Sequence, residues 1–399
     1  MVRAFRLDAR LFAVLVVLVV LGVACVGVTP AERALAGESL STAGVNMQAP
    51  AVKRLNSKGC SLIVTWRKTA SASGYQVAYA TTASMKGTAV RNVSGASRTK
   101  LIVKGVDRGK TYYVKVRACK GAKRSAWSSV RALKVSKLGR KDLTRIITKA
   151  SAANKGKKKL KVYNSTYRLS KHKAGKRLLK YVKRMAKSSK INIVMTDLTS
   201  GDTLTYSPMR SMYSASCLKG PFVASLNKWK PGSRSRSSGS MRETIVWSNN
   251  DTYAGLRGRY GSSTMRKMHK YAGIGKSGHS EYYRFMPTRD LAKLWVGSYW
   301  YFYKNTNKNS KWARNLYTHG SNSFIYRAMK GKKKVHAKPG WYPGGAYNVR
   351  NDAGVVMAKV NGKSRPYVVA VMSSAYGDFG KLRKLVKLLD AVHTDMVKR

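Results

Sequence analysis

The chain has 399 residues and carries 79 Lys and Arg against 15 Asp and Glu, a formal charge of +64. A hydrophobic fraction of 43% with eight Trp excludes a disordered basic tail, because such chains lack the apolar residues needed for a core. Four Cys are too few for a disulfide scaffold, and the length predicts two or three domains.

The first forty residues have the layout of an export signal. Residues 1–10 contain three Arg, and residues 11–28 form an uninterrupted apolar run. Ala34-Leu35-Ala36 then supplies the small residues that a signal peptidase needs. The apolar run is also long enough to stay uncleaved as a membrane anchor. Residues 1–36 are therefore expected to be a signal peptide or a membrane anchor, which predicts a secreted or extracytoplasmic bacterial protein associated with the cell envelope.

The positive charge is spread along the chain instead of being concentrated in one module. It amounts to +19 over residues 50–137 and +44 over residues 138–399. Clustered Lys and Arg usually indicate nucleic-acid binding, but export argues against an intracellular nucleic acid as partner. Two interpretations remain open. One is electrostatic retention on anionic cell-wall polymers, and the other is a compositional bias of the lineage.

Residues 50–137 show short alternating runs between Gly and Ser turns, a pattern typical of a β-sandwich. Trp66 ends the second strand, Tyr75 opens the third, and Tyr112 lies where a corner tyrosine is expected. These residues resemble a fibronectin type III domain. In that topology Cys60 and Cys119 lie at opposite ends of parallel strands, so we expect two free thiols. The expected strands cover residues 60–66, 74–79, 99–105, 111–118 and 129–135.

The rest of the chain is expected to be a linker followed by one α/β domain. Residues 138–164, with a Lys run at 155–161, predict a solvated linker. Residues 165–399 then form a domain with a largely antiparallel sheet. Its expected elements are a basic amphipathic helix at 173–190, strands at 191–197 and 203–207, and a hairpin of 352–360 with 365–374. A closing helix at 379–398 places one apolar face on Leu382, Leu385, Val386, Leu389 and Val392.

Ser216 and Lys219 form an S-x-x-K motif at the start of an expected helix. This spacing places both side chains on one face, where the amine can reach the hydroxyl. The helix N-terminus also offers N–H groups to a developing oxyanion. The motif alone is weak evidence, because a Lys-rich chain contains chance copies such as Ser170–Lys173 and Ser225–Lys228.

Two further motifs follow in order along the chain. Ser248-Asn249-Asn250 lies on a helical segment, and Lys338-Pro339-Gly340 precedes the final hairpin. The ordered set resembles the penicillin-recognising serine hydrolases, namely class A β-lactamases and penicillin-binding proteins, whose motifs are S-x-x-K, S-D-N and K-T-G. The resemblance covers about residues 170–399. It implies a β-lactamase- or transpeptidase-like fold that acts on a β-lactam or a peptidoglycan peptide of the D-Ala-D-Ala type.

The resemblance also implies a role for each motif. Ser216 would be the acylated nucleophile, Lys219 would accept its proton, and Ser248 would relay a proton to the leaving nitrogen. The backbone N–H groups of Ser216 and Trp341 would stabilise the oxyanion. The residues that would bind the substrate are Asn250, Lys338, Gly340 and Trp341.

Three features depart from the family pattern. Pro339 replaces a hydroxyl residue, and Asn249 replaces Asp. The E-x-x-L-N loop, whose Glu activates the deacylating water, is not found. Glu281 lies in the corresponding region without matching neighbours and is the candidate deacylation base, whereas Glu243 is expected on a surface helix.

The resulting hypothesis is an exported serine hydrolase of the β-lactamase or penicillin-binding type, with acylation at Ser216. The alternative is a cell-wall-adhesion protein whose hydrolase domain is catalytically weak or vestigial. No cofactor is expected. The six His form no H-x-x-x-H or Cys/His cluster, so no metal site is expected either.

Overall fold

The computed structural model describes residues 47–275, 278–304, 307–320 and 322–398. The predicted signal peptide or anchor of residues 1–36, with its apolar run at 11–28, lies outside the described residues. Among the residues described, no helix combines the length and the apolarity needed to cross a bilayer.

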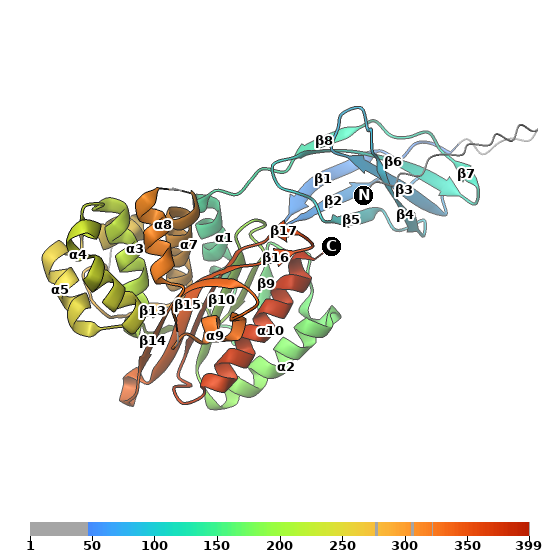
Figure 1. Ribbon diagram of the computed structural model, residues 1–399. Coiled ribbons are helices and arrows are strands. Elements are labelled where there is room, and N and C mark those ends of the chain that lie inside the picture. Colours follow the sequence, from blue (N-terminus) through green and yellow to red (C-terminus); the bar gives the residue numbers. More distant parts are fainter. Residues whose placement is uncertain (1–46, 276–277, 305–306, 321, 399) are drawn as a thin grey trace, which may run out of the picture. The chain divides into compact units, whose positions relative to one another are not determined.

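The N-terminal module is a sandwich of two antiparallel sheets, as its alternating pattern predicts (Figure 1). One sheet has the order β1-β2-β5, and the other has the order β4-β3-β6-β7 with β8 paired to β6. The bounds are β1 (Val52–Lys58), β2 (Ser61–Trp66), β3 (Gly74–Ala80), β4 (Ala89–Ser94), β5 (Lys100–Lys104), β6 (Thr111–Lys120), β7 (Lys123–Arg124) and β8 (Arg131–Lys134).

Both sheets contribute to one core in this module. The rings of Trp66 and Tyr75 meet edge to face with centroids 5.3 Å apart. Tyr112 Oη accepts a 2.6 Å hydrogen bond from the backbone N–H of Asp107, which confirms the corner tyrosine. Cys60 and Cys119 do not form a disulfide with each other, as predicted.

The predicted linker at 138–164 is wrong for most of its length. Helix α1 (Arg140–Ala152) buries Leu143 and Ile147 in the same core cluster as Val194 of the C-terminal domain. Its amphipathic spacing explains this, because an apolar stripe must be covered. Strand β9 (Lys161–Tyr163) pairs with β11 (Thr203–Tyr206). Only the Lys-rich residues between α1 and β9 are the solvated segment that the sequence predicts.

The C-terminal domain is built on a six-stranded antiparallel sheet of order β14-β15-β18-β10-β11-β9. The hairpin predicted at 352–374 is confirmed as the pair β15–β18. Strands β10 and β18 are far apart in the sequence but pair with each other in the sheet. The remaining bounds are β10 (Ile191–Asp197), β14 (Lys334–Tyr342), β15 (Val349–Met357) and β18 (Tyr367–Ser373).

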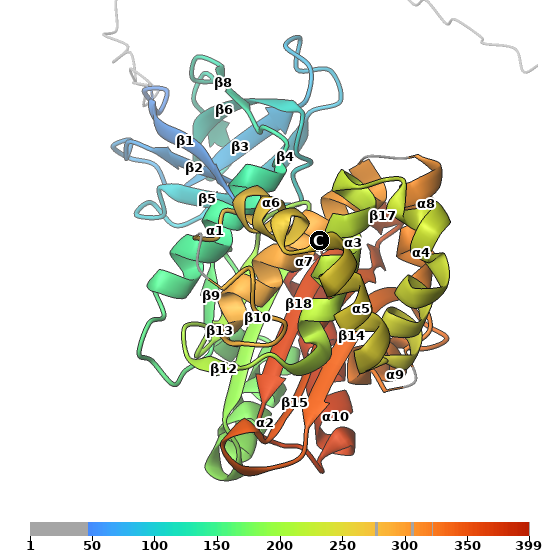
Figure 2. The ribbon, with the colours of Figure 1, turned by 90° about the vertical axis from the view of Figure 1, so that its left-hand side faces the viewer.

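Helices cover both faces of this sheet (Figures 1 and 2). The predicted amphipathic helices α2 and α10 pack on one face with α9, and the five apolar residues predicted for α10 are all buried there. The other face packs against α1, α3 and α7. The bounds are α2 (Lys173–Ser188), α3 (Lys219–Trp229), α7 (Thr288–Lys304), α9 (Phe324–Met329) and α10 (Phe379–Val397).

Short elements complete the domain. Strand β12 (Ser211–Tyr213), just before the S-x-x-K motif, pairs with β13 (Phe285–Pro287). A 3-10 turn, η2 (Ala215–Leu218), joins β12 to α3, and a π-helical turn, η3 (Glu243–Trp247), precedes the second motif. The other elements are α4 (Ser233–Arg242), α5 (Asn250–Tyr260), α6 (Ser263–Ala272), α8 (Lys308–Leu316), β16 (Lys359–Val360), β17 (Lys363–Ser364), η1 (Leu169–Lys171) and η4 (Gly345–Tyr347).

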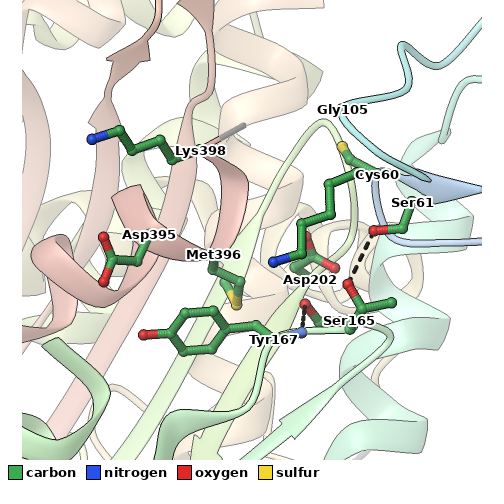
Figure 3. A pocket seen from close by; sticks show the side chains of 11 residues that line it. Cys60, Ser61, Gly105, Ser165, Tyr167, Asp202, Asp395, Met396 and Lys398 are labelled. Atoms are coloured by element: carbon green, nitrogen blue, oxygen red, sulfur yellow. Dashed lines mark hydrogen bonds between the residues drawn. The ribbon is translucent and has the colours of Figure 1, made fainter. Parts of the chain in front are cut away.

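Figure 3 shows a small pocket lined by polar residues near the start of β2. Ser61 Oγ and Thr166 Oγ1 lie 3.0 Å apart in a hydrogen bond. A Cβ added to Gly59 would lie 2.0 Å from Asp202 Oδ1, so only glycine fits beside this carboxylate. Burial raises the pKa of Asp202 to about 7. The pocket lies apart from the three motifs and is not the candidate active site.

Candidate active site

The segment that carries the predicted nucleophile is held from two sides. Ser214 N donates to Arg284 O at 2.8 Å, and Arg284 N donates to Ser214 Oγ at 3.1 Å. Asn351 Nδ2 donates to Tyr213 O at 2.8 Å. Ala215 has a left-handed φ of 47°, a costly conformation for a residue with a Cβ. The next residue, Ser216, is partly exposed on η2, in front of α3.

Lys219 connects the first motif to the second. Its side chain is fully buried, and its Nζ donates to Ser248 O at 2.6 Å, Asn249 O at 3.2 Å and Asn250 Oδ1 at 2.6 Å. Burial lowers the pKa of Lys219 to about 8, against a smaller opposing effect of Asp251. The ammonium therefore finds three acceptors yet gives up a proton more readily than an ordinary Lys.

The second motif lies at the junction of η3 and α5. Ser248 caps the C-terminal end of η3 with a left-handed φ of 62°. Asn249 is the N-cap of α5, and its Oδ1 accepts from Asp251 N at 2.8 Å and Thr252 N at 3.1 Å. An Asp in this place would offer the same acceptor oxygen. The departure from S-D-N therefore leaves the cap of α5 intact.

The third motif lies on β14, the edge strand beside η2. A Cβ added to Gly340 would lie 2.6 Å from Ser216 N and 2.5 Å from Cys217 N, so glycine is required for the close approach of β14 to the nucleophile turn. Pro339 is tolerated because β14 is at the edge of the sheet. Trp341 follows Gly340 directly, with its ring 5.1 Å from the Arg350 guanidinium.

Lys338, two residues before Gly340 on β14, is buried. A Cβ added to Gly220 in α3 would lie 3.0 Å from Lys338 Cβ, so the third motif also packs against the helix that begins at Lys219. Burial, and then the neighbouring positive charge of Lys219, lowers the pKa of Lys338 to about 7. The charge of Lys219 thus disfavours protonation of Lys338 within one site.

A buried carboxylate, Asp352, lies on β15 next to the third motif and is bonded to the start of α9. Asp352 pairs with Pro339 across the sheet, and its Oδ2 accepts from Ser323 Oγ at 2.6 Å and Ile325 N at 2.9 Å. Burial raises the pKa of Asp352 to about 7, and its charge partly offsets the lowering at Lys338. The sequence shows this Asp only as the residue after Asn351 at the start of a strand.

Glu281, the predicted deacylation base, is exposed on the segment before β13. The side chain of this segment that reaches the motifs is Tyr283. Its Oη donates to Asn250 Oδ1 at 2.9 Å, the oxygen that also accepts from Lys219. Burial, and then Tyr213, raises the pKa of Tyr283 to about 12, so the phenol stays protonated at neutral pH.

Tyr283 belongs to an aromatic group that sequence reasoning missed. The ring of Tyr213 lies within 5.0–6.4 Å, centroid to centroid, of the rings of four other residues. The pairing of β12 with β13 brings together residues far apart in the chain, and aromatic residues in a chain with 23 Tyr give no local signal. The four residues are Tyr283, Phe285, Tyr342 and Tyr347.

The structure thus brings the three motifs together, whereas Glu281 is exposed. Cys217, next to the predicted nucleophile, is fully buried, and burial raises the pKa of its thiol well above the usual value. Among the described residues, no group of three or more His, Cys, Asp or Glu is placed to hold a metal ion. The arrangement offers a hydroxyl on a strained turn, two buried amines and a carboxamide. This set suits nucleophilic chemistry.

Comparisons with known proteins give one family match and a set of similar solved structures. The sequence model of the fibronectin type III domain matches residues 49–132. No curated protein matches the sequence. Among solved structures, a class A β-lactamase from Clostridium kluyveri is similar, with 15% sequence identity and a TM-score of 0.42. The alignment covers 55% of this chain and 98% of the β-lactamase chain.

Two further solved structures have similar values. A class A β-lactamase from Mycobacterium abscessus has 15% identity and a TM-score of 0.44, covering 55% of this chain and 98% of its own. A mutant of PBP-A, in an acyl-enzyme complex with penicillin G, has 13% identity and a TM-score of 0.44, covering 55% of this chain and 96% of its own. The chain contains a fibronectin type III domain at residues 49–132, followed by an α/β domain with an antiparallel sheet whose three motifs resemble those of class A β-lactamases and penicillin-binding proteins.

Proposed function

We propose that this protein is an exported serine hydrolase of the β-lactamase or penicillin-binding type, acylated at Ser216 by a β-lactam or a D-Ala-D-Ala-like peptide. One observation carries the proposal. Lys219 Nζ, one helical turn after Ser216, is bonded to all three residues of the second motif, Ser248, Asn249 and Asn250. Chance copies of S-x-x-K have no reason to meet two further motifs in the order that the family shows.

Acylation would use the side chains of the first and second motifs. The hydroxyl oxygen of Ser216 attacks the carbonyl carbon while neutral Lys219 accepts the hydroxyl proton. Burial supports this role, because a pKa of about 8 leaves roughly a tenth of Lys219 neutral at pH 7. The backbone N–H groups of Ser216 and Trp341 stabilise the oxyanion. Ser248 then passes a proton to the departing nitrogen, leaving an ester on Ser216.

The residues around η2, the turn that carries Ser216, would bind the substrate. Asn250 binds the amide side chain of the substrate, and protonated Lys338 attracts its carboxylate. Gly340 keeps β14 close enough for the substrate to lie between the strand and Ser216. Pro339 supplies no hydroxyl for the carboxylate, so Lys338 carries more of that interaction than in relatives with K-T-G.

Hydrolysis of the ester is expected to be slow. Tyr283 Oη, a protonated phenol, is the group bonded to Asn250 Oδ1, whereas Glu281 is exposed. A phenol whose pKa is raised to about 12 is a poor base for activating water. The acyl-enzyme should therefore accumulate, as in a penicillin-binding protein.

The test is covalent labelling of the purified chain with a fluorescent penicillin. Labelling of the wild type and its loss in Ser216→Ala are expected. Ser170→Ala is the matched control, because Ser170 begins another S-x-x-K run on an exposed turn and should leave labelling intact. A wild type that takes no label, or a Ser216→Ala variant that still takes it, would contradict the proposal.

Export and envelope association complete the proposal. They are supported by the Arg-rich start and apolar run of residues 1–28 and by the +62 charge left after cleavage behind Ala36. Residues 50–137, which include the fibronectin type III domain, contribute +19 of this charge, which favours retention on anionic wall polymers. If Ser216 takes no label, the same charge supports wall adhesion as the main function.

A further inference from the structure

One surface groove of the C-terminal domain combines a lysine rim with an apolar floor. Residues 143–196 contain no Asp or Glu, and lysines from two separate parts of this stretch line the groove. The rim is formed by Lys158, Lys159, Lys180, Lys183 and Lys187. The floor is formed by Leu160, Leu179, Val182, Ala186 and Tyr206. We call this surface the lysine groove.

The fold explains why the two segments meet. Helix α2 is amphipathic and buries one face against the sheet and α10, which leaves Lys180, Lys183 and Lys187 on its outer side. Strand β9 pairs with β11, which places the exposed Lys run before β9 beside the helix. The groove is therefore part of the folded domain and not a property of one flexible basic segment.

The apolar floor is continuous with the core below it. Val182 is buried, and Leu160 and Leu179 are partly buried and pack on the same core cluster. Ala186 is exposed between two lysines of α2. The remaining apolar surface of these side chains faces solvent within a ring of cations, which is the arrangement of a binding surface for a molecule that is both apolar and anionic.

None of the residues that line the lysine groove is acidic. Five exposed cations within one groove repel one another, so a bound anion lowers the free energy of the folded protein. Phosphate on a membrane lipid supplies such an anion, and each Lys close to an anionic lipid surface contributes roughly 1 kcal/mol of attraction. A soluble polyphosphate would satisfy the rim alone and leave the floor in water.

We propose that the lysine groove binds an anionic phospholipid at a membrane surface. The ammonium groups of the rim contact the phosphate headgroup, and the first part of the acyl chain lies on Leu160 and Leu179. This binding is independent of the chemistry proposed at Ser216.

The test measures binding of the full chain to vesicles at fixed ionic strength. Phosphatidylglycerol–phosphatidylcholine vesicles are compared with phosphatidylcholine alone, which measures any contribution that does not depend on headgroup charge. Three variants are compared with the wild type. The first replaces the rim lysines Lys180, Lys183 and Lys187 by Gln. The second makes the same change at exposed lysines of the fibronectin type III domain, Lys53, Lys86 and Lys123. The third changes the floor by Leu160→Gln and Leu179→Gln.

The rim variant should bind the anionic vesicles roughly 100-fold more weakly, because each Lys contributes about a fivefold factor. The control variant, with the same net charge, should lose far less affinity, because its three lysines lie outside the groove and an attraction to the lipid surface falls off within a Debye length. The floor variant should bind vesicles more weakly while still binding soluble polyphosphate as the wild type does. Equal losses in the rim and control variants would overturn the proposal, and so would a floor variant with undiminished vesicle binding. Thermal unfolding and penicillin labelling of each variant show whether the fold is retained.

Discussion

Tyr283 and Asn250 are joined by a 2.9 Å hydrogen bond from the phenol to Oδ1. The same oxygen accepts from Lys219, so a phenol stands beside the proposed base. Replacing this phenol by a carboxylate should change the fate of the acyl-enzyme. Glu is shorter than Tyr and would leave room for a water between its carboxylate and Asn250. Tyr283→Glu should therefore shorten the lifetime of the penicilloyl ester by at least about 100-fold, the low end of general-base effects.

The lifetime is measured as loss of fluorescent label after excess penicillin has been removed. Tyr283→Gln is the matched control, because the amide has the same length without basicity. Equal lifetimes for the Glu and Gln variants would show that a base in this position does not limit deacylation.

The rate of acylation should have a narrow pH optimum between 7 and 8. Reaction requires Lys219 to be neutral, so the rate rises as pH increases through its pKa of about 8. Binding of the substrate carboxylate requires Lys338 to be protonated, so the rate falls as pH increases through about 7. The reactive form, with Lys219 neutral and Lys338 protonated, is thus a minor one. Its population is greatest at a pH between the two pKa values.

The second-order rate constant for labelling, measured from pH 5.5 to 9.5, reports these groups in the free protein. A rate that rises without decline to pH 9.5 would remove Lys338 from substrate binding. A rate that is constant below pH 7 would remove Lys219 as the base.

Gly340→Ala should slow acylation by at least about 100-fold, the effect of misplacing a catalytic turn by about 1 Å. The added Cβ would meet backbone atoms at Ser216 N and Cys217 N, which cannot move aside as a flexible side chain does. Gly255→Ala is the matched control, because its Cβ would meet no atom within 4 Å and α5 accepts Ala readily. Similar labelling rates for both variants would show that β14 is not held against the nucleophile turn.

Asn249→Ala should lower the free energy of unfolding by about 1 kcal/mol, the usual cost of losing an N-cap. Asn249→Asp should retain stability, because a carboxylate oxygen can accept from Asp251 N and Thr252 N as the amide oxygen does. Urea unfolding compares the three proteins. An Asp variant as unstable as the Ala variant would mean that the amide nitrogen of Asn249, and not its oxygen, has the structural role.

Asp352→Asn should stabilise the protein more at pH 8 than at pH 5. Burial raises the folded-state pKa of Asp352 from 3.8 to about 7. The cost of ionising it is therefore fully present above pH 7 and disappears as pH falls towards 4. The variant does not ionise, so its stability relative to the wild type should increase by a few kcal/mol between pH 5 and pH 8. A pH-independent difference in urea unfolding would show that Asp352 stays ionised over this range.

Sequence patterns predicted the parts of the fold in which each residue's environment depends on its near neighbours. Strict alternation located β2, β3 and β6, and apolar spacing at i, i+3 and i+4 located α10. The three motifs also met as their order predicts. The Lys- and Ala-rich composition of residues 138–164 obscures helix α1, although Leu143 and Ile147 have helical spacing.

The rest of the site depends on contacts between distant segments. Tyr283 reaches Asn250 only because β13 pairs with β12, and no local pattern encodes that pairing. The burial of Lys338 likewise follows from the approach of β14 to α3 at Gly220. Glu281 is the candidate indicated by residue type, yet it is exposed, and Tyr283, two residues later, reaches Asn250 instead.

The neighbouring positions of β10 and β18 have a consequence for how the protein is made. Asp197 pairs with Tyr367, about 170 residues later in the chain. During synthesis the edge of β10 that pairs with β18 therefore stays unpaired until β18 has been translated. In the folded sheet every residue of β10 is buried. Such non-local pairing slows folding, so the nascent C-terminal domain should depend on a chaperone or on transport in the unfolded state. The fibronectin type III domain, complete before β10 is translated, has no such delay.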